Sequence, residues 1–360
     1  MALDFALFDT LPRNLLPNQT AAVFQQKIGN AAMAEQIGYK YLFFIEHQNS
    51  AFPAITSSNV YLAAVAQATA TLRFGVLVFQ LPLHQPVRLA QDVATVDQIS
   101  HGRFEFGFGY GTVSPEFDPW EVDFNQRREM GVEAMKIIQA AWSNDKFSYD
   151  GKFWRFKNAR PWPHPFQKPH PPIWMGAHSH TSFDYAAENN YNVAQNIETE
   201  SMVAEKFAYF RNAWRKHNHQ GPPPRMLLVR HVHVAETDAK ARAEAETYML
   251  EGILGQFGVK RAATLRPEER TPTMVQNAEI ATRTAQSFDY WIDEGLAFVG
   301  TPETVTRGIM AQQKRCGYDI FAAYHQILGM PHELVERSIK LMGEEVIAHF
   351  QSRLFPAPAE

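Results

Sequence analysis

The sequence predicts a single (β/α)₈ barrel. Short apolar runs alternate with helical patterns along the chain, which is typical of a parallel sheet built from βαβ units. Eight such runs can be counted, the number that a closed barrel of this class requires. The 360 residues also fit one barrel with insertions. We therefore expect one α/β domain over residues 1–360.

The strands and helices follow in order. Strands are expected at residues 4–8, 41–45, 73–79, 103–109, 172–177, 192–196, 225–235 and 319–325. Helices are expected near 19–38, 54–70, 86–100, 125–142, from about 180, at 201–218, at 302–315 and close to the end of the chain. "KFSYDGKFWRF" adds a small hairpin that turns at Asp150 and Gly151.

Residues 252–297, after the seventh strand, interrupt the alternation. They are long and irregular in pattern. Segments of this kind in compact domains are usually lids or binding loops, so we expect a lid over the C-terminal mouth of the barrel. An exposed variable loop is the alternative.

Composition and charge favour a small-molecule partner. The formal net charge is −4 and there is no run of five like charges, so neither nucleic acid nor a membrane surface is expected to bind. The N-terminus lacks a signal-peptide pattern and no long apolar window is present, so a cytoplasmic location is expected. The one cysteine, Cys316, cannot form an internal disulfide and is expected to be inert.

The ends of the second and fourth strands carry candidate site residues, because barrel enzymes build their active sites at the C-terminal ends of the strands. "FFIEHQ" delivers Glu46 and His47, and a histidine there can act as a general base or as a hydrogen-bond donor. A structural histidine at the rim is the alternative reading, and Glu46 points the other way along the strand. "GFGYGT" lacks side chains at Gly107, Gly109 and Gly111, so a flat ligand or a phosphate could approach the backbone.

A phosphate site is predicted after the fifth strand. In "GAHSHTS", Ser179, Thr181 and Ser182 lie at a helix N-terminus, where backbone N–H groups and the helix dipole favour an anion. Simple N-capping explains one of these hydroxyls. Arg127 and Arg128, at the start of the fourth helix, are candidate cationic partners.

His231 and His233 in "RHVHVA" raise the competing hypothesis of metal-assisted hydrolysis, because H-x-H pairs hold metals in barrel hydrolases. Such sites need further ligands on other strands, and only His47 and His325 are obvious candidates. No metal is therefore expected. No G-x-S-x-G, P-loop or H-E-x-x-H motif is present.

Three segments resemble the bacterial luciferase-like, flavin-dependent monooxygenases. They are "GYKYLFFIEHQ", "TLRFGVLVFQLPLHQPVRLAQDVATVDQISHGRFEFGFGYG" and "PIWMGAHSHTSFDYAA", and the likeness covers roughly residues 1–235 and 298–350. The resemblance implies a barrel that binds FMN at its C-terminal mouth, receives it reduced from a separate NAD(P)H-dependent flavin reductase and activates O₂. Members of this family are usually dimers, so a homodimer is expected.

The resemblance also implies roles for particular residues. His47 matches the active-site histidine, Ser179 and Ser182 match the phosphate-binding hydroxyls, and Arg127 or Arg128 matches the phosphate-facing arginine. Further cofactor contacts are expected from Leu77 and Val78, which match a dipeptide that is often joined by a non-prolyl cis bond under the flavin ring, and from Ala177 and His178.

The chain departs from the luciferases themselves at Gly109 and Tyr110, which replace a reactive cysteine and a phosphate-binding arginine. Light emission is therefore not expected, although both residues stay candidate cofactor contacts. An apolar or aromatic organic substrate is expected from aromatic groups at the strand ends, which can equally be barrel packing. These are Phe8, Phe79, Phe108, Tyr324 and His325. Two alternatives stay open on the same barrel: a deazaflavin-dependent dehydrogenase and a non-catalytic flavin-binding protein.

Overall fold

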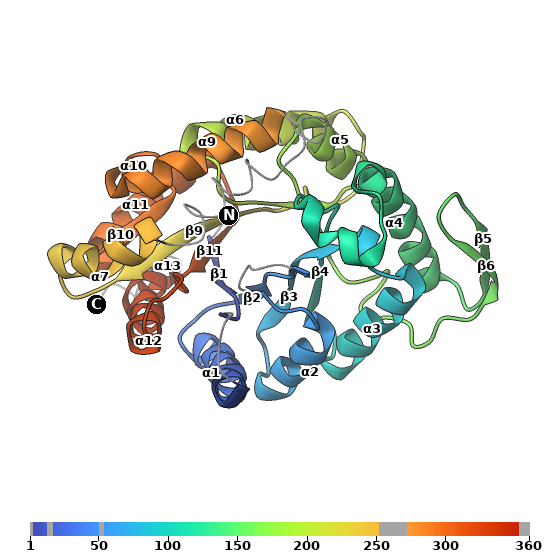
Figure 1. Cartoon of the computed structure of the whole chain (residues 1–360), viewed down its shortest axis with the longest axis horizontal. Coiled ribbons are helices and arrows are strands. Elements are labelled where there is room, and N and C mark those ends of the chain that lie inside the picture. Colours follow the sequence, from blue (N-terminus) through green and yellow to red (C-terminus); the bar gives the residue numbers. More distant parts are fainter. Residues whose placement is uncertain (1–2, 13–16, 50–53, 252–271, 353–360) are drawn as a thin grey trace, which may run out of the picture. The chain divides into compact units, whose positions relative to one another are not determined.

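The structure is a computed structural model, and it describes residues 3–12, 17–49, 54–251 and 272–352. The chain divides into two compact units. The N-terminal unit comprises residues 10–31 and 43–176, and the C-terminal unit comprises residues 1–9, 32–42 and 177–360. Figure 1 shows the elements of both units in sequence colours.

Strands and helices alternate in the N-terminal unit. Its strands are the end of β2 (Tyr41–Phe44), β3 (Arg73–Gln80), β4 (Phe104–Gly109) and β7 (Ile173–Gly176). Its helices are most of α1 (Pro17–Gln36), α2 (Ser58–Ala68), α3 (Pro86–Ile99) and α4 (Arg127–Ser143). Short 3₁₀ turns lie at Leu81–Leu83 (η1), Ser114–Glu116 (η2), Asp118–Trp120 (η3) and Phe124–Gln126 (η4). β3 pairs with β4, and β4 with β7, in parallel.

The pairing of β3 with β4 contains a bulge. Phe74 lies opposite Phe104, but further along the register shifts, and Gln80 lies opposite Gly109. Strand β3 therefore holds one residue more than β4 between these pairs, which is the signature of a β-bulge. Gly75 allows the close approach of the two strands, since a Cβ there would stand 2.0 Å from the carbonyl oxygen of Glu105.

The predicted hairpin is confirmed. β5 (Phe147–Asp150) pairs antiparallel with β6 (Arg155–Ala159), and the N–H of Gly151 donates to the carbonyl of Trp154 at 3.0 Å. The carboxylate of Glu133, on α4, accepts the backbone N–H groups of Lys152, Phe153 and Trp154 at 2.9–3.3 Å. A buried carboxylate thus binds the turn to α4.

The C-terminal unit also has parallel pairing. Its strands are β1 (Asp4–Asp9), β8 (Asn192–Gln195), β9 (Met226–Val234), β10 (Ala297–Gly300) and β11 (Ile320–Tyr324). β1 pairs with β11, and β9 pairs with β8, β10 and β11. Its helices are α5 (His180–Glu188), α6 (Glu200–Arg215), α7 (Asp238–Glu251), α9 (Pro272–Gln286), α10 (Phe288–Asp293), α11 (Pro302–Cys316), α12 (His332–Leu341), the π-helical η6 (Met342–Ile347) and α13 (Ala348–Ser352).

The prediction of an irregular segment at 252–297 is wrong for its second half. Residues 252–271 lie outside the described residues, but α9 and α10 fill most of 272–293, and β10 begins at Ala297. The helical period of α9 rests on Met274, Ile280 and Ala281, and it is diluted by polar residues between them. β10 was missed because it has four residues, of which only Ala297 and Gly300 are buried. The lid function of this segment stays a prediction.

No helix in the described part of the chain combines the length and the apolar character needed to cross a bilayer.

Candidate functional site

His47, which follows β2, faces a buried carboxylate. Its Nδ1 lies 2.9 Å from Oε1 and 3.0 Å from Oε2 of Glu116, in the 3₁₀ turn η2. The Glu116 side chain is 1% exposed and that of His47 is 20% exposed. A neutral His47 must therefore carry its proton on Nδ1 and donate it to the carboxylate, which leaves Nε2 as the ring nitrogen with an acceptor lone pair. Glu116 was not predicted from the sequence.

Gln80, the last residue of β3, lies beside this pair. Its Nε2 donates to Oε2 of Glu116 at 2.8 Å and lies 3.3 Å from Nδ1 of His47. The side chain is 2% exposed. The Glu116 carboxylate thus accepts hydrogen bonds from two side chains on neighbouring segments.

A second histidine–carboxylate pair lies next to the first. Nε2 of His84 is 2.6 Å from Oε1 of Glu46, whose Oε2 accepts a hydrogen bond from Ser58 at 2.7 Å. Burial alone would lower the pKa of His84, but the charge and hydrogen bond of Glu46, together with Asp92, raise it above its usual value. Glu46 is thus a buried acceptor for His84 and Ser58.

Replacing His84 with glutamine should reduce stability more at low pH than at high pH. The raised pKa means that protonated His84 stabilises the fold fully below the unfolded value, near 6.5, and that this contribution is lost as the pH rises through the folded value. We expect the deficit of His84→Gln in the free energy of unfolding to be about 1.5 kcal/mol larger at pH 6 than at pH 9. Urea unfolding at both pH values measures this. An equal deficit at both would contradict it.

The Leu77–Val78 peptide bond is cis, as the resemblance implied. Two strand ends near Val78 lack side chains. A Cβ on Gly109 would stand 2.7 Å from the Cγ2 of Val78, and one on Gly176 would stand 3.2 Å from its Cγ1. The Val78 side chain therefore fills the space that these two glycines leave open.

The two candidate arginines differ in their contacts. Arg127 donates to the carbonyls of Gly111 and Phe124, at 3.2 and 2.8 Å, and its guanidinium lies 3.8 Å from the Phe124 ring centroid. Arg128 lies over the Tyr110 ring, 5.8 Å from its centroid. Arg127 therefore stabilises the loop between β4 and α4 through these hydrogen bonds.

Three hydroxyls cluster at the start of α5. Ser179 is the N-cap, and its Oγ accepts from the N–H of Ser182 at 3.3 Å. The same Oγ lies 2.9 Å from Oγ1 of Thr181 and 3.0 Å from Oγ of Ser182. The cluster thus combines helix capping with the donor set that a phosphate would use.

A buried ion pair lies under this loop. Nζ of Lys206, on α6, is 2.6 Å from Oε1 of Glu198 and donates to the carbonyl of His178 at 2.7 Å. Glu198 is fully buried and also accepts from Gln195 at 2.8 Å. Burial alone would raise the pKa of Glu198, but His178 and Lys206 lower it below its usual value. The pair fixes the backbone just before Ser179, and the sequence did not predict it.

The predicted substrate residues are mostly buried. Phe79, Phe108 and His325 are fully buried and Phe8 is 3% exposed. Phe8 packs edge-on against Tyr324, with centroids 5.4 Å apart. His325 contacts the hydroxyls of Tyr39 and Ser338, at 3.1 and 2.8 Å. Their role in substrate binding stays a prediction.

The two histidines of the metal hypothesis have different surroundings. His231 stacks on Tyr324, with centroids 4.6 Å apart, and burial together with Arg230 lowers its pKa to about 4. His233 lies 2.8 Å from Glu244. Within the described ranges, no group of three or more His, Cys, Asp or Glu could hold a metal. Burial, aided by Glu200, raises the pKa of Cys316 to about 11, so this thiol is protonated at neutral pH.

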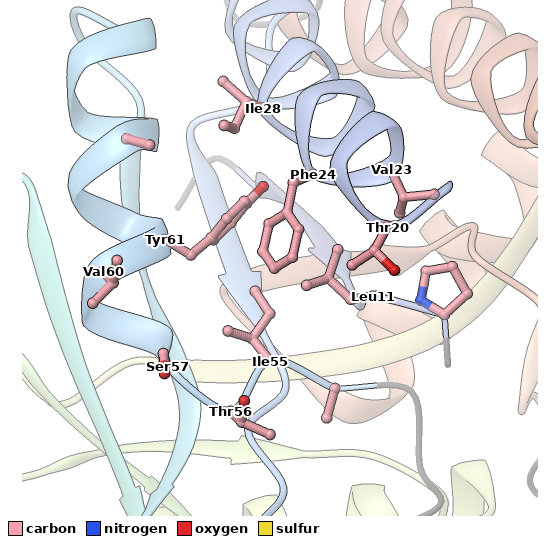
Figure 2. A pocket seen from close by; sticks show the side chains of 13 residues that line it. Leu11, Thr20, Val23, Phe24, Ile28, Ile55, Thr56, Ser57, Val60 and Tyr61 are labelled. Atoms are coloured by element: carbon pink, nitrogen blue, oxygen red, sulfur yellow. The ribbon is translucent and has the colours of Figure 1, made fainter. Parts of the chain in front are cut away.

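Figure 2 shows an apolar pocket between α1 and α2. Its volume is about 630 Å³. None of the residues predicted from the sequence lines it, although Ile55 in its wall forms a β-bridge with Glu46. The lining residues are Leu11, Pro12, Thr20, Val23, Phe24, Ile28, Ala54, Ile55, Thr56, Ser57, Val60, Tyr61 and Ala64.

Comparison with known proteins identifies the family. The model of the luciferase-like monooxygenase family matches residues 4–319, so the chain belongs to this family. It is 28% identical over 250 residues to the oxygenase component of the flavin-dependent trigonelline monooxygenase of Acinetobacter baylyi, covering 67% of this chain and 68% of that protein. For the first curated relatives it matches, the chain spans only a little over half of their length, 56% and 54%.

Solved structures show the same fold. The oxygenating constituent of 3,6-diketocamphane monooxygenase from Pseudomonas putida, in complex with FMN, has a TM-score of 0.77 at 20% identity, covering 96% of this chain and 98% of that one. An F420-dependent secondary alcohol dehydrogenase has a TM-score of 0.74 at 16% identity, covering 97% and 99%. The predicted (β/α)₈ barrel class is confirmed.

Proposed function

We propose that this chain is the oxygenase of a two-component, FMN-dependent monooxygenase. It would use reduced FMN and O₂ to oxygenate a small apolar or aromatic organic substrate. An NAD(P)H-dependent flavin reductase would supply the reduced FMN, and the chain would act as a homodimer. Membership of the luciferase-like monooxygenase family supports the class of reaction.

The residues present fit a flavin with a phosphorylated tail. The half-buried Val78 side chain, which fills the space beside Gly109 and Gly176, offers an apolar surface to a flat ring, and three hydroxyls at the N-terminus of α5 offer donors to a phosphate. Bound reduced flavin would supply the electrons that activate O₂. Arg127 or Arg128 would face the phosphate: Arg127 donates to two backbone carbonyls of its own loop, and Arg128 lies over the Tyr110 ring.

The observation that carries the proposal is the His47–Glu116 pair. His47 stands where the resemblance expects the active-site histidine, and a fully buried carboxylate holds its Nδ1. In this arrangement Nε2 accepts a proton from a bound group, and Glu116 stabilises the resulting imidazolium. His84 also faces a buried carboxylate, so what distinguishes His47 is its place directly after β2, where the resemblance expects the active-site histidine.

An anaerobic titration tests the cofactor. The purified protein should bind reduced FMN stoichiometrically, and admission of air in the presence of an apolar or aromatic substrate should consume O₂ and give an oxygenated product. A parallel titration with a reduced deazaflavin tests the dehydrogenase alternative. The proposal would be overturned if the protein bound the reduced deazaflavin but not reduced FMN. It would also be overturned if none of the substrates in a broad panel changed the rate of oxygen uptake.

Replacing Ser182 with aspartate should weaken FMN binding selectively. A carboxylate at this position repels the phosphate and occupies the N-terminus of α5 in its place. We expect the dissociation constant for FMN to rise about 30-fold, equivalent to about 2 kcal/mol, and that for riboflavin, which has no phosphate, to stay within about twofold. Fluorescence titration with both ligands measures this. Equal weakening of both would show that the phosphate is held elsewhere.

A further inference from the structure

The buried amide of Gln80 uses its donor end but not its acceptor end. Its Nε2 donates to Oε2 of Glu116 at 2.8 Å, while its Oε1 is buried without a hydrogen-bond partner among the described residues. A buried polar atom left unsatisfied costs free energy, so an apolar residue would be the cheaper occupant unless the donor end is needed. The donor end is the part of this side chain that meets the His47–Glu116 pair.

The bulge in β3 places this amide. In regular pairing Gln80 would lie one position further along β4, but the extra residue before Phe79 puts Gln80 opposite Gly109. Because side chains alternate along a strand, a one-residue shift turns every later side chain to the other face. Bulges next to active sites commonly re-aim a side chain in this way. Phe79 is thereby turned to stack on Phe106, and Gln80 is turned to Glu116.

The proton inventory fixes the direction of each hydrogen bond. An amide nitrogen only donates, and a neutral imidazole has one N–H. If that hydrogen is on Nδ1 of His47, it goes to Glu116, and of the two amide hydrogens of Gln80 one goes to Glu116 and the other faces the Glu46 carbonyl, 3.5 Å away. Gln80 Nε2 and His47 Nδ1, 3.3 Å apart, are then not hydrogen-bonded to each other. Both donate to the Glu116 carboxylate.

We propose that Gln80 is a positioning residue, which holds the Glu116 carboxylate against Nδ1 of His47 and thereby fixes the Nδ1–H tautomer of the ring. The effect is that Nε2 is the nitrogen that exchanges a proton with a bound ligand. The catalytic role of this tautomer rests on the function proposed above. The existence of the tautomer does not depend on that function.

Nitrogen NMR of the full chain tests the tautomer without any cofactor. With ¹⁵N-labelled histidine at pH 9, the signals of His47 are identified by their loss in His47→Gln. Wild type should show a protonated Nδ1 and an unprotonated Nε2, the reverse of the form that neutral imidazole favours in water. In Gln80→Met, which has similar length and no donor, the Nδ1–H form should fall from at least tenfold excess to a mixture.

A second variant and a control keep the result unambiguous. Gln80→Leu also removes the donor, so it should give the same loss at pH 9 and decides the matter if Gln80→Met does not fold. Gln195→Met removes an equivalent buried bond, from Gln195 to Glu198 at 2.8 Å, and should leave the His47 signals unchanged. A wild-type ring protonated on Nε2, or variants that retain the wild-type signals, would overturn the proposal.

A kinetic readout separates this inference from the proposed function. In Gln80→Met the rate of substrate oxygenation should fall about tenfold, a part of the 10²–10⁴ that a general base contributes, with the dissociation constant for reduced FMN within about twofold. If wild type does not bind reduced FMN, the proposed function fails while the NMR result still decides the role of Gln80. A tautomer change with an unaltered rate would show that Gln80 positions the ring but that the position does not serve catalysis.

Discussion

Replacing His47 with alanine should abolish coupled oxygenation while leaving FMN binding intact. The substitution removes Nε2 as a proton acceptor and leaves a buried Glu116 without its imidazole partner. The hydroxyls at the start of α5 and the glycines beside Val78 are unchanged. We expect the rate of product formation to fall by a factor of about 10²–10⁴, the usual contribution of a positioned general acid or base. Oxygen consumed without product should be released as hydrogen peroxide.

The measurement is the ratio of oxygenated product to hydrogen peroxide per reduced FMN supplied. His164→Ala is the control, because His164 also faces a carboxylate, Asp145 at 3.0 Å, but it lies in the segment after β6 and Asp145 is exposed. The control should keep the wild-type ratio. If His47→Ala forms product at the wild-type rate, the role assigned to this histidine is wrong.

The sequence located His47 but not its partner, for a physical reason. A histidine directly after an apolar strand stands out, because the strand end fixes where it lies. Glu116 is 69 residues further along the chain, in a 3₁₀ turn within a polar loop, and no periodic pattern marks it. The contact exists only because β3, β4 and the loop after β4 bring the two together. Gln80 was hidden for another reason, since the bulge in β3 reverses the face that simple alternation assigns to it.

The fold was predicted best where apolar periodicity is strong. The eight main strands and the hairpin at Gly151 are present near the expected positions. The failures lie at 272–300, where α9 carries many polar residues, α10 has only six residues and β10 only four. The buried pair Glu198–Lys206 was also missed, because two charged residues eight apart, one in a loop and one on a helix, look solvent-exposed in sequence.

Replacing Lys206 with methionine should destabilise the protein strongly. Methionine fills similar space but leaves the fully buried Glu198 without its ammonium partner. Removing one member of a buried pair typically costs about 3–5 kcal/mol, because the remaining charge stays desolvated. His178, 3.3 Å from Glu198, can offset part of this, so we expect about 3 kcal/mol at pH 7. Urea unfolding measures the change.

The pH dependence and a double variant distinguish a charge effect from lost packing. In wild type, the lowered pKa of Glu198 means that its contribution is present above the unfolded value and lost only as the pH falls through the folded value. Without Lys206 the buried carboxyl should take up a proton more readily, so the deficit of Lys206→Met should shrink between pH 7 and pH 4.

Adding Glu198→Gln should recover much of the stability at pH 7, because it removes the stranded charge. The control is Arg315→Met, which breaks the ion pair between Arg315 and Glu200; the Arg315 side chain is 57% exposed. There the change should stay below about 1 kcal/mol. A deficit of Lys206→Met that is the same at both pH values and is not relieved by Glu198→Gln would mean that packing of the lysine stem, and not its charge, holds the loop before Ser179.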